Sequence, residues 1–336
     1  MNPISTKNKF NYGEAIREGF VHLLDNHPDV FVLGQGLWSP WYVGNTMKDL
    51  DVIYGKDRII DTPVSEAATT GAAIGASLTG LRPIVIHPRV DFMILATDQI
   101  VNQAAKWSSM LGGQAHPAVT IRAIINRGGE QGAQHSQALH SWFAHVPGLR
   151  VVTPSSVLDA RDLFIASVLS DDPVLFLEDR WLYDQVDELP ASPQLTPLHE
   201  LGPRISRPGE DLTIVGSGYS AYLALKVADE LARSGIESEV IDLRILNPFK
   251  KDLIVKSVAK TKRLLAIDGS WETCGLGGEI IASVCESLEL GTLKAKPMRL
   301  GLPHAPAPTS KPLEEAYYPT VKSVLDAIKS MNISKH

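Results

Sequence analysis

Alternation of strand-like and helix-like segments along the whole chain most limits what this sequence can fold into. Short β-branched runs such as 30–34, 83–87 and 174–178 are separated by stretches with apolar residues at helical spacing, such as 12–26 and 157–169. Strands that alternate with helices at this spacing form parallel sheets through right-handed crossovers. The sequence therefore predicts an α/β protein built on parallel sheets.

The alternation is interrupted once, between residues 184 and 210. This stretch contains five prolines and little periodicity, which indicates a connection between two units. The pattern then restarts with expected strands at 212–216, 237–242 and 263–268. We expect two domains, residues 1–189 and 211–336, joined by a linker at 190–210. Further helices are expected at residues 67–78, 96–110, 220–234, 250–261, 278–288 and 317–331.

Composition excludes several classes of protein. The formal net charge of −6 provides no large positive field for nucleic acid or anionic lipid. Two cysteines outside any C-x-x-C pair cannot form a disulfide framework or a four-cysteine zinc site. No apolar run has the length of a membrane span, and the polar first twenty residues do not resemble a signal peptide. We expect a cytoplasmic protein without nucleic-acid or membrane partners.

A possible dinucleotide fingerprint occurs in the second expected domain. The sequence Gly216-Ser217-Gly218-Tyr219-Ser220-Ala221 follows a strand and precedes a helix, and Asp242 ends the next strand. Such a pattern can place a pyrophosphate on the helix N-terminus and a ribose on the acidic residue. A tight strand-to-helix turn favours glycine even without a nucleotide, so both interpretations stay open at this point.

Three histidines follow a glycine-rich segment at 128–132. His135, His140 and His145 are five residues apart, a spacing that scatters side chains around a helix and argues against a shared metal ion. Ser136 is a preferred capping residue, so we expect a helix to begin there, with His135 just before it. The positive helix end would then favour a neutral imidazole, suited to hydrogen bonding and proton exchange.

Glu66 follows the expected strand at 58–61 and opens a helix of small residues, directly after Ser65. Acidic residues are common in the first turn of a helix for electrostatic reasons alone. The carboxyl end of a parallel strand is also where open α/β sheets bind ligands, and glycines at 71 and 75 would let a flat ligand approach closely. Glu66 is therefore a candidate for proton transfer.

An ordered set of motifs resembles one known family over nearly the whole chain. The set includes Thr62-Pro63-Val64-Ser65-Glu66, Gly80-Leu81-Arg82-Pro83, Gln134-His135-Ser136-Gln137 and Leu302-Pro303-His304. Its order and spacing are similar to those of the beta subunit of the thiamine-diphosphate-dependent decarboxylating component of 2-oxo acid dehydrogenase complexes, within the transketolase-like superfamily. The resemblance implies a pyrimidine-binding domain followed by a domain of the transketolase C-terminal type.

The resemblance also implies site residues. Glu66 matches the glutamate that hydrogen-bonds the aminopyrimidine ring of thiamine diphosphate and so activates the cofactor. Phe92 matches the aromatic residue that lies against that ring, with Ser65 and Gln35 as further cofactor-binding candidates. His135 matches the active-site histidine that faces the substrate and the lipoyl group. Backbone groups of Ser167, Val168, Ser170 and Asp172 correspond to a potassium site.

A metal-binding motif that the cofactor requires is missing from the sequence. Family members hold the magnesium diphosphate through G-D-G followed by an asparagine, and this chain contains no G-D-G. The resemblance thus implies an alpha subunit that carries this motif and Mg²⁺, an assembly of two alpha and two beta chains, and a lipoyl-domain partner. The expected function is decarboxylation of a 2-oxo acid with acyl transfer to lipoyl.

Two alternatives remain at this stage. The loop from Trp38 to Tyr42 departs from the acidic, glycine-rich loop usual in relatives, and Gln35 replaces its acid. A split transketolase-like or acyloin-forming carboligase subunit would account for a changed acceptor pocket. The stretch from Gly216 to Asp242 leaves a nucleotide-binding or catalytically silent interaction protein as an alternative of another class.

Overall fold

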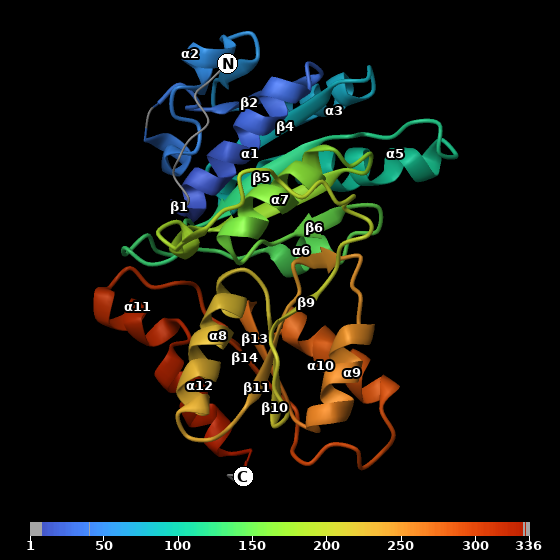
Figure 1. Cartoon of the computed structure of the whole chain (residues 1–336). Coiled ribbons are helices and arrows are strands. Elements are labelled where there is room, and N and C mark those ends of the chain that lie inside the picture. Colours follow the sequence, from blue (N-terminus) through green and yellow to red (C-terminus); the bar gives the residue numbers. More distant parts are fainter. Residues whose placement is uncertain (1–8, 40, 332, 334–336) are drawn as a thin grey trace. The chain divides into compact units, whose positions relative to one another are not determined.

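The computed structural model describes residues 9–39, 41–331 and 333. The chain divides into two compact units, unit 1 with residues 1–125 and 142–201 and unit 2 with residues 126–141 and 202–336. Residues 126–141 were expected in the first domain, but their contacts group them with unit 2. Each unit is described separately below, with the elements labelled in Figure 1. No helix in the described part of the chain is long and apolar enough to cross a membrane.

Unit 1 is built on a parallel sheet whose strands follow the order β6-β7-β5-β4-β2-β3. The strands are β1 (Lys9–Asn11), β2 (Val30–Gln35), β3 (Ile59–Thr62), β4 (Arg82–His87), β5 (Thr120–Ile125), β6 (Arg150–Val152), β7 (Val174–Asp179) and β8 (Val186–Glu188). The longer helices are α1 (Tyr12–Asn26), α3 (Glu66–Ser77), α5 (Ala105–Met110) and α7 (Val157–Val168). The shorter ones are η1 (Tyr42–Asn45), α2 (Leu50–Tyr54), α4 (Val90–Met93), η2 (Ile94–Ala96), η3 (Gln99–Ala104) and η4 (Arg180–Leu182), and α6 (His140–Ala144) crosses the division between the units.

Helix α1 shows how local sequence and packing agree. Asn11 and Glu14 form a capping box, each side chain bonding the other's backbone N–H at 2.8 Å. The helix buries its apolar face against α7, as Figure 1 shows. A Cβ at Gly19 would lie 2.9 Å from the Phe164 ring, so glycine permits this close approach. The range expected from the sequence, 12–26, is confirmed.

A continuous helix expected at 96–110 is wrong in detail. The structure has a short 3₁₀ turn (η2), a π-helical segment (η3) and only then α5. A π-helical turn accommodates an extra residue while keeping apolar side chains on the same side. The hydrophobic pattern therefore does not distinguish it from a regular helix.

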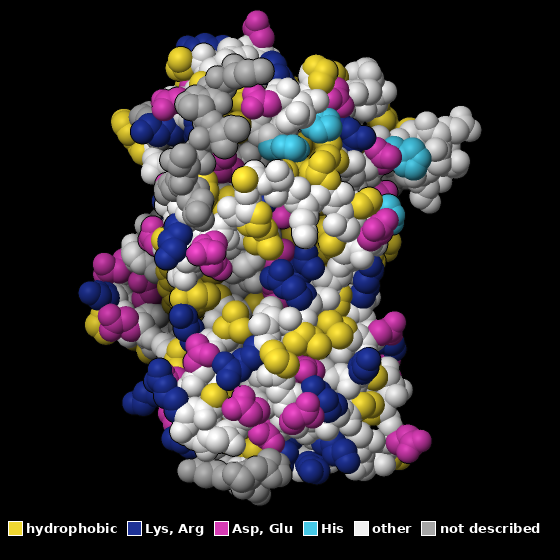
Figure 2. Space-filling view, viewed as in Figure 1, with side chains coloured by type: hydrophobic (Ala, Val, Ile, Leu, Met, Phe, Trp, Pro, Cys, Tyr) yellow, Lys and Arg dark blue, Asp and Glu magenta, His cyan; other side chains and the backbone are white. Residues whose placement is uncertain are grey.

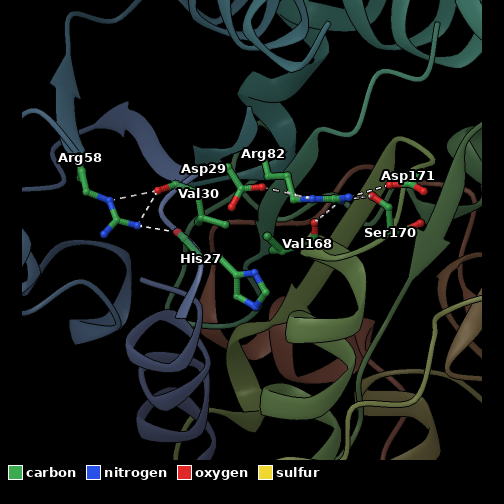
Figure 3. Close-up of polar contacts among 8 residues, drawn as sticks. All are labelled: His27, Asp29, Val30, Arg58, Arg82, Val168, Ser170 and Asp171. Carbon is green, nitrogen blue, oxygen red and sulfur yellow. Dashed lines mark hydrogen bonds and ion pairs between the residues drawn. The ribbon is translucent and has the colours of Figure 1, made fainter. Parts of the chain in front are cut away.

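Two arginines connect the amino ends of the unit 1 strands (Figure 3). Arg58 donates to the backbone oxygens of Leu24, His27 and Val30 at 2.8–3.2 Å. Arg82 donates to the carbonyls of Val168 and Ser170 at 3.2 and 2.9 Å. It also pairs with the carboxylates of Asp29 and Asp171 at 3.5 and 2.6 Å. This edge is thus occupied by structural contacts, which leaves the opposite, carboxyl edge for a ligand.

Unit 2 has a second sheet of order β14-β13-β10-β11-β9. Its strands are β9 (Arg204–Arg207), β10 (Leu212–Gly216), β11 (Ser238–Asp242), β13 (Leu264–Trp271) and β14 (Met298–Leu302), and unit 2 also contains β12 (Ile245–Asn247). Its helices are α8 (Tyr219–Ala232), α9 (Asp252–Thr261), α10 (Leu276–Ser287), α11 (Lys311–Tyr317) and α12 (Val321–Lys329). Figure 1 shows α8 with α12 on one side of this sheet and α9 with α10 on the other. A core of Leu, Ile, Val and Ala side chains fills the α8 side.

The proline-containing stretch at 184–210 contains more regular structure than its prolines suggested. β8 pairs with β1 in unit 1, and β9 adds an antiparallel edge strand to the unit 2 sheet by pairing with β11. Residues 189–203 between them contain no helix or strand. Edge strands tolerate proline and need little hydrophobic periodicity, because only one side is hydrogen-bonded. The sequence pattern therefore missed them.

Candidate active site

The carboxyl ends of three neighbouring strands carry the residues assigned to the cofactor. β2 pairs in parallel with β3 on one side and β4 on the other, so all three end at the same edge of the sheet. Gln35 is the last residue of β2, Glu66 opens α3 after β3, and Phe92 lies in α4 after β4. Ligands of open parallel sheets bind at this edge. The structure thus places these candidates in one region of unit 1.

Glu66 is partly buried at the first position of α3. Ser65, the exposed residue before it, makes no side-chain capping bond. The small residues of α3 leave space beside the helix, since a Cβ at Gly75 would meet no atom within 4 Å and one at Gly71 only the Gln99 side chain at 3.6 Å. A carboxylate placed here can accept a hydrogen bond from a ring N–H of a flat ligand.

The α4 segment provides an aromatic surface and a buried histidine stands just before it. Phe92 is 37% exposed, although neighbouring residues of this short helix are buried. His87 ends β4, is almost fully buried, and has Nε2 3.1 Å from the Thr70 hydroxyl of α3. Burial lowers the pKa of His87 to about 4, so its imidazole is neutral at pH 7. This contact fixes the helix that Glu66 opens, a role that sequence reasoning missed.

The loop after β2 is folded back onto β3. The Gly36 N–H donates to the Asp61 carboxylate at 2.6 Å, and the indole N–H of Trp38 donates to the Ile59 carbonyl at 2.8 Å. Gly36 has φ +71°, and a Cβ there would lie 2.5 Å from the Tyr42 ring. Only glycine satisfies both conditions, so it lets Tyr42 pack directly over the end of β2.

Tyr42 and Arg89 are two further polar residues at this edge, and neither was expected in the site from the sequence. Burial raises the pKa of the Tyr42 phenol, the Arg89 charge lowers it, and Asp61 and Glu66 raise it. The charges of Arg89, Asp61 and Glu66 thus affect this hydroxyl in opposite directions. Arg89 Nη1 is buried and has no hydrogen-bond partner among the described residues. The charge at 89 was visible in the sequence, but its proximity to Tyr42 depends on the fold.

His135 belongs to unit 2, on a segment fixed to β13 and α11. Arg127 Nη1 donates to the Gly269 carbonyl at 2.8 Å, and the Glu130 N–H reaches the Glu314 carboxylate at 3.0 Å. His140 Nε2 lies 2.8 Å from Asp268 in a buried pair. His135 is itself partly exposed. Because Glu66 and His135 belong to different units, the proposal that they act together rests on the family pattern.

The expected start of a helix at Ser136 is wrong. Residues 136–139 are not helical, and α6 begins at His140. The helix-dipole argument for a neutral His135 therefore does not apply. Ser136 is a good capping residue in isolation, but the segment is stabilised by contacts with unit 2, such as the His140–Asp268 pair, and these override the local preference.

Comparison with known proteins identifies the family. Residues 8–185 match the transketolase pyrimidine-binding domain and residues 203–324 the transketolase C-terminal domain. The beta subunit of acetoin:2,6-dichlorophenolindophenol oxidoreductase from Cupriavidus necator is 39% identical over 334 residues, covering 96% of this chain and 97% of that protein. The mitochondrial pyruvate dehydrogenase E1 component beta subunit of Bos taurus is 36% identical, covering 95% and 90%. The chain belongs to this beta-subunit family.

Membership confirms the expected fold, with two transketolase-type domains, and the dependence of the family on thiamine diphosphate. A solved structure described as "Split gene transketolase, inactive beta4 tetramer" aligns with a TM-score of 0.74 and 21% identity, over 97% of this chain and 99% of that one. At this identity the likeness shows the fold alone. The carboligase alternative is not favoured, because the relatives at 34–39% identity are acetoin and pyruvate dehydrogenase beta subunits.

The dinucleotide interpretation finds no support at its acidic residue. Asp242 is fully buried, its Oδ2 lies 3.7 Å from Arg204 Nη2, and its Oδ1 accepts the Arg244 N–H at 3.2 Å. A Cβ on Gly216 would lie 2.8 Å from the Ala221 nitrogen, which explains this glycine by a tight turn. In this beta-subunit family member, the glycine-rich turn is therefore structural.

The described residues contain no group of three or more His, Cys, Asp or Glu side chains that could hold a metal ion. Of the backbone carbonyls expected at a potassium site, those of Val168 and Ser170 accept hydrogen bonds from Arg82, as Figure 3 shows. The Ser167 carbonyl accepts the Ser170 N–H at 3.2 Å. Each of these three carbonyls therefore accepts a hydrogen bond from within the chain.

The face drawn in Figure 2 carries cationic and anionic side chains interspersed rather than one continuous positive patch. This agrees with the net charge of −6 and gives no support for binding to nucleic acid.

Proposed function

We propose that this chain is the beta subunit of a heteromeric thiamine-diphosphate enzyme that decarboxylates a 2-oxo acid and passes the acyl group to a lipoyl carrier. The observation that carries the proposal is Glu66, which lies at the carboxyl edge of the sheet in a chain 36% identical to a mitochondrial pyruvate dehydrogenase E1 component beta subunit. Thiamine diphosphate, when bound, supplies the carbanion chemistry that amino-acid side chains cannot.

The residues at this edge fit the pyrimidine end of the cofactor. Glu66 is partly buried at the first position of α3, and later in this helix Gly75 leaves open space, so the Glu66 carboxylate can share a proton with a ring nitrogen of a flat ligand. Phe92 presents an exposed ring on which an aminopyrimidine can stack. Ser65 and Gln35 are polar groups at the same edge and would orient the ring. Through Thr70, His87 keeps α3 fixed while Glu66 exchanges its proton.

His135 is proposed to contact the substrate and the incoming lipoyl group. Its segment is anchored on both sides, by Arg127 and Glu130 before it and His140 after it. Such anchoring reduces the motion of a loop residue and favours a defined hydrogen bond to a reacting group. The histidine itself is partly exposed and so remains accessible.

The diphosphate end requires a second chain. The sequence contains no G-D-G, and the described residues provide no metal-ligand cluster. We propose an alpha subunit that carries G-D-G and a following asparagine, binds Mg²⁺ with the diphosphate, and assembles with this chain as two alpha and two beta subunits. A lipoyl-domain protein would accept the acyl group. Potassium at residues 167–172 stays a prediction from the resemblance.

The test compares Glu66→Gln with the exposed-site control Glu286→Gln, each co-expressed with the alpha subunit. We expect Glu66→Gln to assemble normally and bind the cofactor, yet to exchange the reactive C2 proton of the cofactor with deuterium at least 100-fold more slowly, in the range of lost general acid–base catalysis. The rate of decarboxylation should fall by the same factor. Exchange at the rate of the control would overturn the role of Glu66, and no acylation of a lipoyl domain by the wild-type complex would overturn the proposed acceptor.

A further inference from the structure

Arg89 lies beside the site but does not contribute to the proposed cofactor contacts. It is the cap residue of α4, which places it between β4 and Phe92. Its Nη1 is buried without a hydrogen-bond partner in the part of the chain that the structure describes. A buried guanidinium nitrogen without an acceptor costs free energy, so its acceptor is expected from outside the described residues. The charge acts on Tyr42 at the same edge as Glu66.

Tyr42 provides a second donor, because it follows β2 as Arg89 follows β4, at the same edge of the sheet. Burial raises the pKa of its phenol, so the hydroxyl remains protonated at neutral pH and can donate. The ring is held against Gly36 at the end of β2. Of the two nearby carboxylates, Asp61 accepts the Gly36 N–H at 2.6 Å, and Glu66 is assigned to the cofactor ring. Of these four side chains, the Arg89 guanidinium and the Tyr42 hydroxyl can therefore donate hydrogen bonds to an anion.

We propose that Arg89, with Tyr42, recognises an anionic substituent of the substrate, a carboxylate or phosphate separate from the group that is lost as carbon dioxide. This inference rests on the proposed function and specifies its substrate class. Arginine binds both anions through paired N–H donors, and Tyr42 adds one O–H donor. A purely aliphatic 2-oxo acid would leave the buried Nη1 unsatisfied, which disfavours such substrates.

The test uses the assembled alpha–beta holoenzyme with hexacyanoferrate(III) as the electron acceptor, so that no lipoyl partner is needed. Two pairs of 2-oxo acids are compared, 2-oxoglutarate with its amide 2-oxoglutaramate and phosphohydroxypyruvate with hydroxypyruvate. The two members of each pair are compared by their kcat/KM values. For a compound that is not turned over, its inhibition constant is compared instead. We expect the wild type to prefer, in at least one pair, the compound with the additional anionic group over the compound that lacks it, and the preferred pair distinguishes carboxylate from phosphate.

Arg89→Gln should reduce that preference about 10- to 100-fold, the range for a hydrogen bond to a charged group. Arg89→Lys should retain part of it, and the exposed Arg233→Gln should retain all of it. Equal use of both members of each pair by the wild type would overturn the proposal, as would an unchanged preference in Arg89→Gln. A raised KM for thiamine diphosphate with unchanged preference would instead assign Arg89 to the diphosphate.

Failure here is distinguishable from failure of the proposed function. C2-proton exchange measured in Glu66→Gln tests the cofactor site without reference to substrate charge. A complex that loses exchange in Glu66→Gln but shows no anion preference retains the proposed function and refutes only the assignment of Arg89.

Discussion

The burial of His87 should make the stability of unit 1 depend on pH. Its imidazole is 2% exposed, contacts Thr70, and has a pKa lowered by burial to about 4 from 6.5. The unfolded chain therefore binds this proton at higher pH than the folded chain does. The contribution of the buried, neutral His87 to the free energy of unfolding is fully present above about pH 6.5 and is lost as the pH falls toward 4. The difference of about 2.5 between the pKa values of the unfolded and folded states corresponds to about 3 kcal/mol in the free energy of unfolding. Most of this free energy is lost by about pH 4.5.

The prediction is tested with His87→Gln, which removes the titration and keeps a polar group near Thr70. Hydrogen exchange of amides in β4 is followed by mass spectrometry at several pH values after correction for intrinsic rates, and urea unfolding is followed by circular dichroism. Between pH 7.5 and 4.5, the wild type should lose about 2.5 kcal/mol more than the variant does. His116→Gln, at an exposed histidine, is the control and should behave as the wild type.

An equal pH dependence in the wild type and His87→Gln would refute the reasoning, since all other titrating groups are common to both. A variant already unstable at pH 7.5 would still be informative, because the prediction concerns the change with pH rather than the starting value.

Three further substitutions test the framework by thermal and urea unfolding. Arg82→Met should lower the free energy of unfolding by about 1–3 kcal/mol, because the Val168 and Ser170 carbonyls lose their donor and the ion pair with Asp171 is removed. Asp268→Asn breaks the buried pair with His140 and should cost about 3–5 kcal/mol. Burial opposes ionisation of Asp268 but His140 lowers its pKa to about 2, so this contribution should persist down to about pH 4. Gly34→Ala places a Cβ 2.6 Å from the Ile86 carbonyl and should cost about 1–3 kcal/mol.

Each of these substitutions has a matched control. Arg233→Met and Asp326→Asn alter exposed charges and should change stability by less than about 0.5 kcal/mol. Gly75→Ala adds a Cβ in open space within α3 and should be neutral or stabilising by up to about 1 kcal/mol. A control that costs as much as its partner would show that the named contact does not determine the loss.

Strong local patterns were sufficient for much of the fold. The helix at 12–26 and the strand at 212–216 agree with the structure at both ends, because each combines clear periodicity with a cap or a glycine turn. The edge strands β9 and β14 were missed, since their pairing is decided by distant partners. Glu66 could be proposed because it opens a helix after a strand, a position that recurs in ligand-binding sheets.

The sequence by itself determined the α/β class, the family, the candidate glutamate and the absence of a G-D-G motif, since these depend on residue order and local spacing. Only the tertiary structure showed that Asp242 is paired with Arg204, that 126–141 groups with unit 2, and that Arg89 acts on Tyr42. Each of these depends on side chains that are far apart in the sequence and come together only through strand order. Electrostatic energies vary with distance and burial, and the fold determines both.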